Sequence, residues 1–381
     1  MTVREVDPAG PGLRRRRAGR GFSYYDEQGR RITDTAVIDR IKALAIPPAW
    51  TDVWICPEPS GHIQACGLDA RRRRQYRYHE AWRTQRDRDK HDRMLDLARA
   101  LPRLRSRVRR DLSSDGMGRD RVLACAVRLL ELGLFRVGGE PYVEENGSYG
   151  LATLRKRHVR AVGDELRFDY PGKGSQRRVV TIGDPQVADV VRALKRRRGG
   201  GPELFAYKDE RGHWVDLRSS DINDYVQREL GPEFSAKDFR TWTATILAAV
   251  ALAAEEDVET ERQRQKAVVR VVRRVALALG NTPAVARGSY VEPRVIERYE
   301  CGETVGGALE VEQVEAMVET VLGNGEGCDG VDRGSDPAEG QGDDVSSLDG
   351  VPRTLLAEID AAVVDLIERS PRRRVGARRR R

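Results

Sequence analysis

The spacing of hydrophobic residues divides the chain into a region of short period and a region of long period. From Phe22 to about residue 79, short apolar runs alternate with turn residues, and a period of two is typical of β-strands. One helical stretch, 34–43, interrupts these runs and ends before Pro47 and Pro48. The pattern therefore predicts a small β-rich domain over residues 22–82.

Beyond residue 80, apolar residues recur at intervals of three and four, which is the spacing of amphipathic helices. The predicted helices are 93–110, 118–132, 185–198, 219–230, 237–254, 261–279 and 311–322. Between the second and third of them, three β-prone runs with turns at 163–164 and 172–174 predict an antiparallel meander. Residues 83–322 are therefore expected to form a larger, mainly helical domain with a small sheet, so the predicted fold class is α+β.

The composition changes at both ends of the chain. Residues 1–21 are rich in Gly, Arg and Pro, which favours a flexible leader. Residues 323–350 contain 8 acidic residues, 1 Arg and 8 Gly, a composition typical of a flexible acidic linker. Within 351–381, apolar residues at helical spacing predict a short helix, and an Arg-rich tail with 7 Arg follows it at 371–381.

Charge points toward a polyanionic partner. The chain holds 68 Lys and Arg against 60 Asp and Glu, a formal net charge of +8. The excess is uneven, because residues 71–110 hold 16 basic and 5 acidic residues, a local net charge of +11. A run of this kind is typical either of a solvated face or of a surface that binds phosphates.

Several functional classes are disfavoured by what the sequence lacks. No apolar run reaches the roughly 18 residues of a membrane span, and no secretory leader opens the chain, so a cytoplasmic protein is expected. The five Cys and five His are scattered without a CxxC or HExxH motif, so neither a disulfide framework nor a metal site is predicted. Cys66 and Cys125 are expected to be small buried residues.

No P-loop, GxSxG motif or dinucleotide-binding glycine fingerprint is present. Five residues nevertheless occupy unusual settings: Arg136, Lys173, Arg240, Asn281 and Tyr290. Together they provide what cleavage of a phosphodiester needs. A tyrosine phenolate can attack phosphorus, arginines can bind the nonbridging oxygens, and a lysine can protonate the leaving sugar oxygen.

Each of these residues taken alone also has a structural interpretation. Arg136 is also explained as a cation at a helix C-terminus, and Lys173 as a solvated turn residue. Arg240 near the start of an apolar helix needs a partner, and Asp238 is close in sequence. Asn281 is also suited to the end of a helix after a glycine, and an isolated Tyr290 is more often a packing residue.

The combination of motifs, in their order along the chain, resembles bacterial, poxvirus-like type IB DNA topoisomerases. The resemblance covers roughly residues 22–300. It is carried by IPPAW (46–50), QYRYH (75–79), FRVGGEPYVEENGSYGLATLRKRHV (135–159), PGKGS (171–175), KDFRTW (237–242) and LGNTPAVARGSYV (279–291). It implies a C-shaped clamp around duplex DNA, in which the larger domain is the catalytic domain and resembles that of tyrosine recombinases.

The resemblance also implies roles for the five residues. Tyr290 is expected to form a 3′-phosphotyrosyl link and expel a 5′-hydroxyl. Arg136 and Arg240 are expected to bind the scissile phosphate, and Lys173 is expected to act as the general acid. Asn281 stands where many relatives have histidine, and its neutral amide is expected to donate a hydrogen bond to a nonbridging oxygen. Supercoils would relax by strand swivelling and religation, without ATP, metal or another cofactor.

DNA contacts are expected from a second set of residues in the N-terminal domain. Arg71, Arg72, Arg73 and Arg74 are expected to bind phosphates, which would make binding depend on salt. Relatives use the residues that match Gln75, Tyr76 and Tyr78 on bases and backbone. Strand alternation places neighbours on opposite faces, so an irregular segment is expected there. Tyr142 matches a tyrosine that contacts phosphate.

Two other functions remain open at this point. A tyrosine recombinase shares the phosphotyrosine chemistry, but recombinases usually present HxxR at the second arginine, where this chain has Lys237-Asp238-Phe239-Arg240. A non-catalytic DNA-binding clamp is the other alternative. The preferred interpretation is a monomeric topoisomerase associated with the bacterial nucleoid, with duplex DNA as its partner. Among the histidines, His158 is the one expected near the site.

Overall fold

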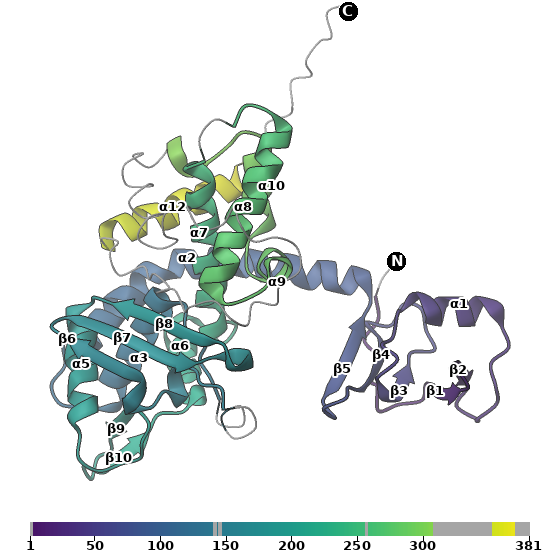
Figure 1. Ribbon diagram of the computed structural model, residues 1–381, viewed down its shortest axis with the longest axis horizontal. Coiled ribbons are helices and arrows are strands. Elements are labelled where there is room, and N and C mark those ends of the chain that lie inside the picture. The colour runs from purple at the N-terminus through teal and green to yellow at the C-terminus, as the bar shows by residue number, and fades with distance from the viewer. Residues whose placement is uncertain (1–2, 140–142, 144–146, 256–257, 308–352, 370–381) are drawn as a thin grey trace, which may run out of the picture. The chain divides into compact units, whose positions relative to one another are not determined.

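The computed structural model describes residues 3–139, 143, 147–255, 258–307 and 353–369 (Figure 1). The chain divides into two compact units, Met1–Arg93 and Met94–Arg381. Helix α2 (Glu80–Leu112) begins in the first unit and continues into the second. The first unit contains an antiparallel sheet and the second is mainly helical, which agrees with the predicted α+β class.

The first unit is built on a five-stranded antiparallel sheet with the order β2-β1-β3-β4-β5. Its strands are β1 (Leu13–Ala18), β2 (Gly21–Tyr25), β3 (Thr51–Ile55), β4 (Ile63–Leu68) and β5 (Arg74–Tyr78). Helix α1 (Thr35–Ala43) contributes Ile41 to the core that it shares with β1, β3 and β4. The Asp34 carboxylate caps this helix by accepting a hydrogen bond from the Ala36 amide at 2.8 Å.

The prediction of a flexible leader over residues 1–21 is wrong for the part that forms strand β1. This strand pairs with β2 on one side and with β3 on the other. The run LRRRRA has the composition of a disordered arm, yet its arginines find partners. The guanidinium groups of Arg15 and Arg16 lie 4.1 and 4.7 Å from the ring centroids of Phe22 and Tyr25. Arg15 also donates to the backbone oxygens of residues 46, 47 and 50, so it holds the IPPAW segment in place.

The second unit is a helical assembly around a buried helix. Among the described residues, its helices beyond α2 are α3 (Arg119–Gly133), α5 (Pro185–Arg196), α6 (Ser219–Leu230), α7 (Ala236–Ala253), α8 (Glu261–Leu279), α9 (Pro283–Ser289), α10 (Pro293–Glu300) and α12 (Arg353–Glu368). Helix α7 is buried over almost its whole length, because α3, α6, α8, α10 and α12 all pack against it. The helix predicted at 311–322 lies outside the described residues.

The predicted meander is present as β6 (Val159–Val162), β7 (Glu165–Pro171) and β8 (Arg177–Ile182) (Figure 1). Its first strand is shorter than expected, because residues 151–153 and 156–158 form 3₁₀ turns. A second sheet, which the sequence did not predict, pairs β9 (Ala206–Lys208) with β10 (Trp214–Asp216).

Helix α12 fulfils the prediction of a short helix within 351–381, and it packs into the core of the second unit. Leu356, Ile359 and Val363 are buried against the other helices. The Trp242 indole of α7 donates to the Asp360 carboxylate at 2.8 Å, and Arg105 of α2 pairs with Asp360 at 2.7 Å. The acidic linker predicted at 323–350 and the tail at 371–381 lie outside the described residues.

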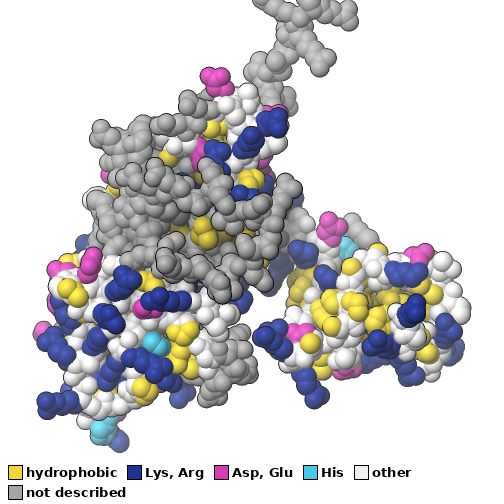
Figure 2. Space-filling model, in the orientation of Figure 1, with side chains coloured by type: hydrophobic (Ala, Val, Ile, Leu, Met, Phe, Trp, Pro, Cys, Tyr) yellow, Lys and Arg dark blue, Asp and Glu magenta, His cyan; other side chains and the backbone are white. Residues whose placement is uncertain are grey.

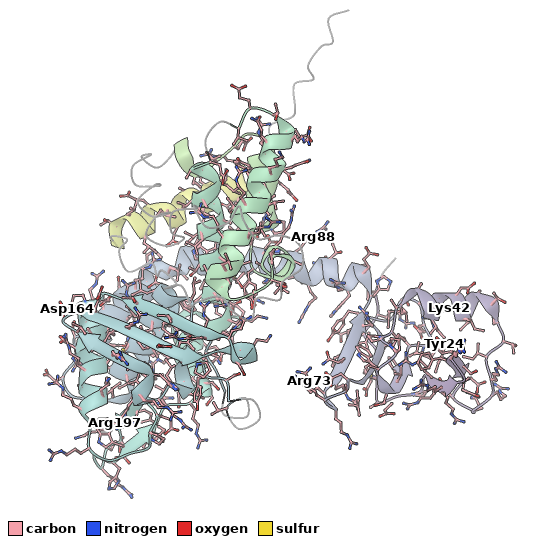
Figure 3. The ribbon with its side chains drawn as sticks, viewed as in Figure 1. Tyr24, Lys42, Arg73, Arg88, Asp164 and Arg197 are labelled. Atoms are coloured by element: carbon pink, nitrogen blue, oxygen red, sulfur yellow. The ribbon has the colours of Figure 1, made fainter. Side chains whose placement is uncertain are left out.

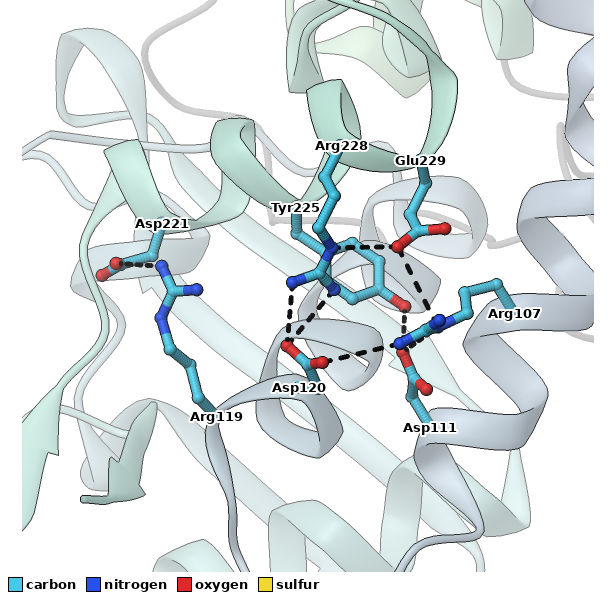
Figure 4. A network of polar contacts seen from close by, with 8 residues as sticks. All are labelled: Arg107, Asp111, Arg119, Asp120, Asp221, Tyr225, Arg228 and Glu229. Carbon is cyan, nitrogen blue, oxygen red and sulfur yellow. Dashed lines mark hydrogen bonds and ion pairs between the residues drawn. The ribbon is translucent and has the colours of Figure 1, made fainter. Parts of the chain in front are cut away.

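A second set of polar contacts joins α2, α3 and α6 (Figure 4). The hydroxyl of the fully buried Tyr225 donates to Asp111 at 2.7 Å, and Arg107 pairs with the same carboxylate at 2.8 Å. Arg119 and Asp221 pair at 2.7 Å. The Tyr225 contact joins α6 to α2 and the Arg119 contact joins α3 to α6, so these two contacts fix the register in which the helices pack.

Two smaller predictions are settled by burial and length. Cys66 and Cys125 are buried free cysteines, as expected. Among the described residues, no helix combines the length and apolar character that crossing a membrane requires.

Candidate active site

Tyr290 lies at the C-terminal end of the short helix α9, and its side chain is 8 % exposed. Its amide donates to the carbonyl of Ala286 at 3.0 Å. Its own carbonyl accepts a hydrogen bond from the Thr245 hydroxyl of α7 at 3.3 Å. The tyrosine is therefore anchored through its backbone to two helices, and its phenol is left to face the neighbouring arginines.

Arg136 follows helix α3 in a segment with tightly constrained backbone. Leu134 ends the helix in the left-handed region, with φ of 52°, which is uncommon for a residue other than glycine. The carbonyl of Arg136 accepts a hydrogen bond from the Leu151 amide at 2.8 Å. Gly138 and Gly150 bring the two segments together, since a Cβ on Gly150 would lie only 2.4 Å from the Gly138 Cα.

The half-buried Arg136 side chain contacts two other predicted site residues. Its Nη1 donates to the Tyr290 hydroxyl at 3.5 Å, and its Nη2 donates to the Asn281 side-chain oxygen at 2.8 Å. The sequence alone allowed Arg136 to be a simple helix-end cation. These contacts instead place it between the phenol and the amide.

Arg240 is 4 % exposed on α7, and its guanidinium carbon lies 5.5 Å from the centroid of the Tyr290 ring. Its two terminal nitrogens donate to the backbone carbonyls of Leu134 and Leu279. Burial, together with the nearby charges of Arg136 and Arg178, lowers the pKa of Arg240 to about 9. The group is still cationic at neutral pH. Asp238, the alternative partner, accepts hydrogen bonds from Ser235 and so caps the helix.

Asn281 combines a structural and a polar role. Gly280 ends α8 in the left-handed conformation, and the Asn281 amide donates to the Ala276 carbonyl at 2.9 Å, as in a helix-capping turn. The side chain turns toward Arg136. Its Nδ2 is buried and has no hydrogen-bond partner among the described residues. A buried amide nitrogen without a partner is suited to donate a hydrogen bond to an oxygen of a bound ligand.

Lys173 lies in the single 3₁₀ turn, Lys173–Ser175, that connects β7 to β8. The side chain is exposed and lines a small pocket together with Arg136 and Arg240. The remaining lining residues are Leu134, Tyr149, Tyr170, Gly172, Gln176, Arg178, Leu279 and Gly280. The structure therefore brings Arg136, Arg240, Asn281 and Tyr290 into one cluster and places Lys173 at the wall of the adjoining pocket.

The electrostatics of the cluster favour the phenolate form of Tyr290. Burial alone raises the pKa of a phenol, because it disfavours the charged form. At Tyr290 the hydrogen bond from Arg136 and the positive charges of Arg240 and Arg136 outweigh burial, so the pKa is lowered. Tyr170 in the same pocket shows the opposite result, because burial dominates there and raises its pKa.

The predicted DNA-contact residues of the first unit lie on an exposed edge strand. Tyr76 and Tyr78 are 40 % and 43 % exposed, and their rings stack with centroids 5.8 Å apart. The prediction of an irregular segment here is wrong, because β5 is a continuous strand. The irregularity lies instead in the neighbouring strand β4, where Gln64 is the extra residue of a β-bulge. Alternation therefore groups the two tyrosines on one face.

Arg71, Arg72 and Arg73 belong to a tight turn organised by Asp69, and Arg74 is the first residue of the strand. The Asp69 carboxylate accepts hydrogen bonds from the amide and side chain of Arg73, from the Gln75 side chain and from the Arg71 amide, which together lower its pKa to about 2. Arg73, labelled in Figure 3, lies at the margin of the first unit. All four arginines are exposed. Tyr142, the remaining predicted contact, lies outside the described residues.

Two features near the pocket extend the predicted set. His158, which the sequence placed near the site, is 7 % exposed and packs edge-on against the pocket residue Tyr149 at 4.5 Å. Arg178 was not predicted, although the sequence held a signal. It shares the phase of the buried Val180 and Ile182 on β8, and an arginine on a core-facing position needs a partner.

Lys and Arg side chains are scattered over the described part of the viewed surface of the second unit (Figure 2). Among the described residues, no group of three or more His, Cys, Asp or Glu side chains is arranged to hold a metal ion.

Comparison with known proteins covers both units. Residues 79–303, more than half of the chain, match the family model described as eukaryotic DNA topoisomerase I, catalytic core. Residues 21–69 match the model described as bacterial DNA topoisomerase IB, N-terminal domain.

Individual relatives carry the same kind of name. DNA topoisomerase 1B of Acanthamoeba polyphaga mimivirus is 33 % identical over 296 residues, which is 76 % of this chain and 88 % of the relative. DNA topoisomerase 1B of Vaccinia virus (strain Copenhagen) is 21 % identical over 273 residues, covering 69 % and 82 % of the two chains. DNA topoisomerase 1 of Mycosarcoma maydis is 24 % identical over 219 residues, 53 % of this chain and 21 % of that relative.

Proposed function

The chain belongs to the type IB DNA topoisomerase family, and from this premise we propose that Tyr290 and its neighbouring cations carry out the reaction. The enzyme is a DNA topoisomerase that relaxes supercoiled duplex DNA by breaking and rejoining one strand. The N-terminal family match and the topoisomerase names of the relatives favour this activity over recombination.

Tyr290 is the proposed nucleophile. Its phenolic oxygen attacks the scissile phosphorus, the Tyr O–P bond forms, and the bond from phosphorus to the 5′-oxygen breaks. The product is a 3′-phosphotyrosyl link and a free 5′-hydroxyl. The lowered pKa of Tyr290 supports this role, because it brings the reactive phenolate closer to neutral pH.

Arg136 and Arg240 are the proposed phosphate ligands. The transition state places extra negative charge on the nonbridging oxygens, and fixed guanidinium groups stabilise that charge without having to reorganise. Both groups are already fixed by backbone carbonyls, the Asn281 side chain or the Tyr290 hydroxyl. The unpartnered Nδ2 of Asn281 supplies a neutral donor for the same oxygens.

Lys173 is the proposed general acid. It lines the pocket next to both arginines, and its exposed amine is free to approach the leaving 5′-oxygen. Proton transfer to this oxygen neutralises the alkoxide as it leaves. Religation reverses the step, with the 5′-hydroxyl attacking the phosphotyrosine and its proton returning to the lysine.

No external energy source is needed in this scheme, because the phosphotyrosyl bond conserves the energy of the phosphodiester. Between cleavage and religation the cut strand swivels, and the torsion of the DNA drives the change in linking. The proposed chemistry uses no ATP and no metal, because the side chains provide nucleophile, cations and acid.

DNA binding is assigned to both units. We infer that they close around duplex DNA as a clamp whose catalytic part resembles that of tyrosine recombinases. Arg71–Arg74 would contact phosphates, while Gln75, Tyr76 and Tyr78 would contact bases and backbone, and Tyr142 a phosphate. The exposed tyrosine stack and the exposed arginine turn support this assignment. We also propose that the enzyme acts as a monomer and is associated with the bacterial nucleoid.

The contact between Arg136 and the Tyr290 hydroxyl is the observation that carries the proposal. The test is a covalent adduct. A nicked duplex that loses its short 5′-hydroxyl fragment after cleavage traps the enzyme on DNA, and the adduct survives denaturing electrophoresis. Wild type is expected to form it and Tyr290→Phe is expected to form none. Tyr299→Phe, which alters another buried tyrosine, serves as the control. An adduct on Tyr290→Phe would overturn the proposal.

A further inference from the structure

The C-terminal end of α8 collects three arginines from different parts of the second unit. Arg178 of β8 donates to the Ala278 carbonyl at 2.8 Å. Arg240 of α7 donates to the Leu279 carbonyl, and Arg136 contacts the Gly280 carbonyl at 3.5 Å. Three consecutive carbonyls thus each hold one guanidinium.

This arrangement explains how like charges share one pocket. The last carbonyls of a helix have no partner within the helix and carry partial negative charge, so they stabilise nearby cations. Within the described part of the chain, none of the three arginines forms an ion pair with a carboxylate. Burial and the charge of Arg136 lower the pKa of Arg178, which is consistent with a cation held without a counter-ion.

Arg178 also touches the turn that carries Lys173. It lies directly opposite Tyr170 in the β7–β8 register, two residues before Gly172 on the partner strand. The Gly172 backbone packs on its aliphatic stem, since a Cβ on Gly172 would lie 2.8 Å from the Arg178 Cγ. At the other end of the side chain, a Cβ on Gly280 would lie 2.9 Å from Nη1. One side chain therefore spans from the residue before Lys173 to the residue before Asn281.

We propose that Arg178 is a positioning residue that fixes the Lys173 hairpin against the C-terminal end of α8. The inference rests on the proposed function, in which Lys173 protonates the leaving oxygen. Without Arg178 the hairpin loses this attachment to the end of α8, two residues before Asn281. The proton donor would then be misplaced, while Tyr290 and the other two arginines would keep their own anchors.

The test separates proton donation from phosphate binding. Replacing the bridging 5′-oxygen of the scissile phosphate with sulfur makes a substrate whose leaving group is a thiolate. A thiolate departs with its electron pair and needs no proton, because its conjugate acid is far stronger than an alcohol. A variant that has lost only proton donation is therefore rescued by this substrate.

Arg178→Ala is expected to cleave ordinary DNA about 10- to 100-fold more slowly than wild type. This is less than the roughly 10²- to 10⁴-fold contribution of a general acid, because the proton donor is misplaced and not removed. On the sulfur substrate its rate should come within about threefold of wild type, as should that of Lys173→Ala. Arg177→Ala is the matched control, because Arg177 is the adjacent arginine, is exposed, and pairs with Asp169 at 2.6 Å. It should stay within about twofold of wild type on both substrates.

Each result has a definite meaning. If Lys173→Ala is rescued and Arg178→Ala is not, the positioning role is wrong and the proposed function stands. If neither is rescued although wild type cleaves both substrates, the assignment of Lys173 fails, and the inference fails with it. If wild type forms no adduct on either substrate, the proposed function itself is overturned.

Arg178→Lys adds a readout that a general loss of folding would not produce. A lysine keeps the charge and a hydrogen-bonding ammonium group but loses the planar fork. It should recover part of the cleavage rate on ordinary DNA relative to Arg178→Ala. Recovery no better than alanine, with both variants folded by circular dichroism, would contradict the role of the contact with the Ala278 carbonyl.

Discussion

Two clusters of arginines in the second unit are stabilised in different ways. Between α2, α3, α12 and the start of α5, Arg105 and Arg128 pair with the carboxylates of Glu131, Asp184 and Asp360. At the end of α8, Arg136, Arg178 and Arg240 use backbone carbonyls. Carboxylates cancel the charge of an arginine, whereas carbonyl dipoles only reduce the cost of holding it. The first cluster therefore serves the fold, and the second retains positive charge, which we propose binds the DNA phosphate.

The largest effect expected from this comparison is on catalysis. Arg240→Ala should slow formation of the covalent adduct by about 10³-fold, as expected when a fixed donor to the transition state is removed. The free energy of unfolding should change much less than the activation free energy of cleavage, because the substitution also relieves repulsion from Arg136 and Arg178. Single-turnover cleavage and urea unfolding measure the two quantities. A large loss of stability with little loss of cleavage rate would show that Arg240 serves the fold and not catalysis.

The carboxylate cluster should show the converse pattern. Asp360→Ala removes a buried partner of Arg105 and of the Trp242 indole, and breaking a buried pair of this kind costs about 3 kcal/mol. Urea unfolding should report that loss, while the cleavage rate of the folded fraction should stay near wild type. Asp365→Ala, on the exposed side of the same helix, is the control. Equal destabilisation by both substitutions would show that Asp360 has no special role.

The smallest effect concerns pH and His158. Burial, with the charges of Arg157 and Arg155, lowers the pKa of this histidine from 6.5 to about 4. The unfolded chain then binds more protons between these values, so stability is present above 6.5 and is lost as the pH falls toward 4. At about pH 5 the loss should approach about 2 kcal/mol relative to neutral pH.

His158→Gln tests this dependence, because the glutamine oxygen can still accept the Arg155 amide that now donates to Nδ1 at 3.1 Å. Urea unfolding across this pH range should give a flatter profile than wild type. An unchanged slope would mean that another group is responsible.

The sequence predicted the elements whose ends carry strong local signals. Helices α6 and α8 were predicted with the bounds observed, and α8 begins at a Thr260–Gln263 capping box and ends at Gly280. Helices α9 and α10 were not identified, because seven- and eight-residue helices show too little periodicity. Strand β1 was missed because its four arginines resemble a disordered arm until their aromatic partners are known.

The five expected residues of the candidate active site were predicted from the sequence, but Arg178 was not. The family resemblance, confirmed by the matched family models, led to Tyr290 and its four expected partners. Their individual roles stay predictions. Arg178 was missed because alternation along β8 shows that it faces inward but not that α8 ends there. Contacts between segments about a hundred residues apart depend on packing, which a local pattern does not contain.

The central claim is that Tyr290, the general acid Lys173 and arginines held by backbone carbonyls break and rejoin DNA without a metal or ATP. Relaxation of a negatively supercoiled plasmid, in EDTA and without ATP, tests it most directly. Wild type and Tyr299→Phe should convert the plasmid to relaxed topoisomers, and Tyr290→Phe should leave it supercoiled while still binding duplex DNA. Relaxation by Tyr290→Phe at the wild-type rate, or a strict need of wild type for metal or ATP, would contradict the claim.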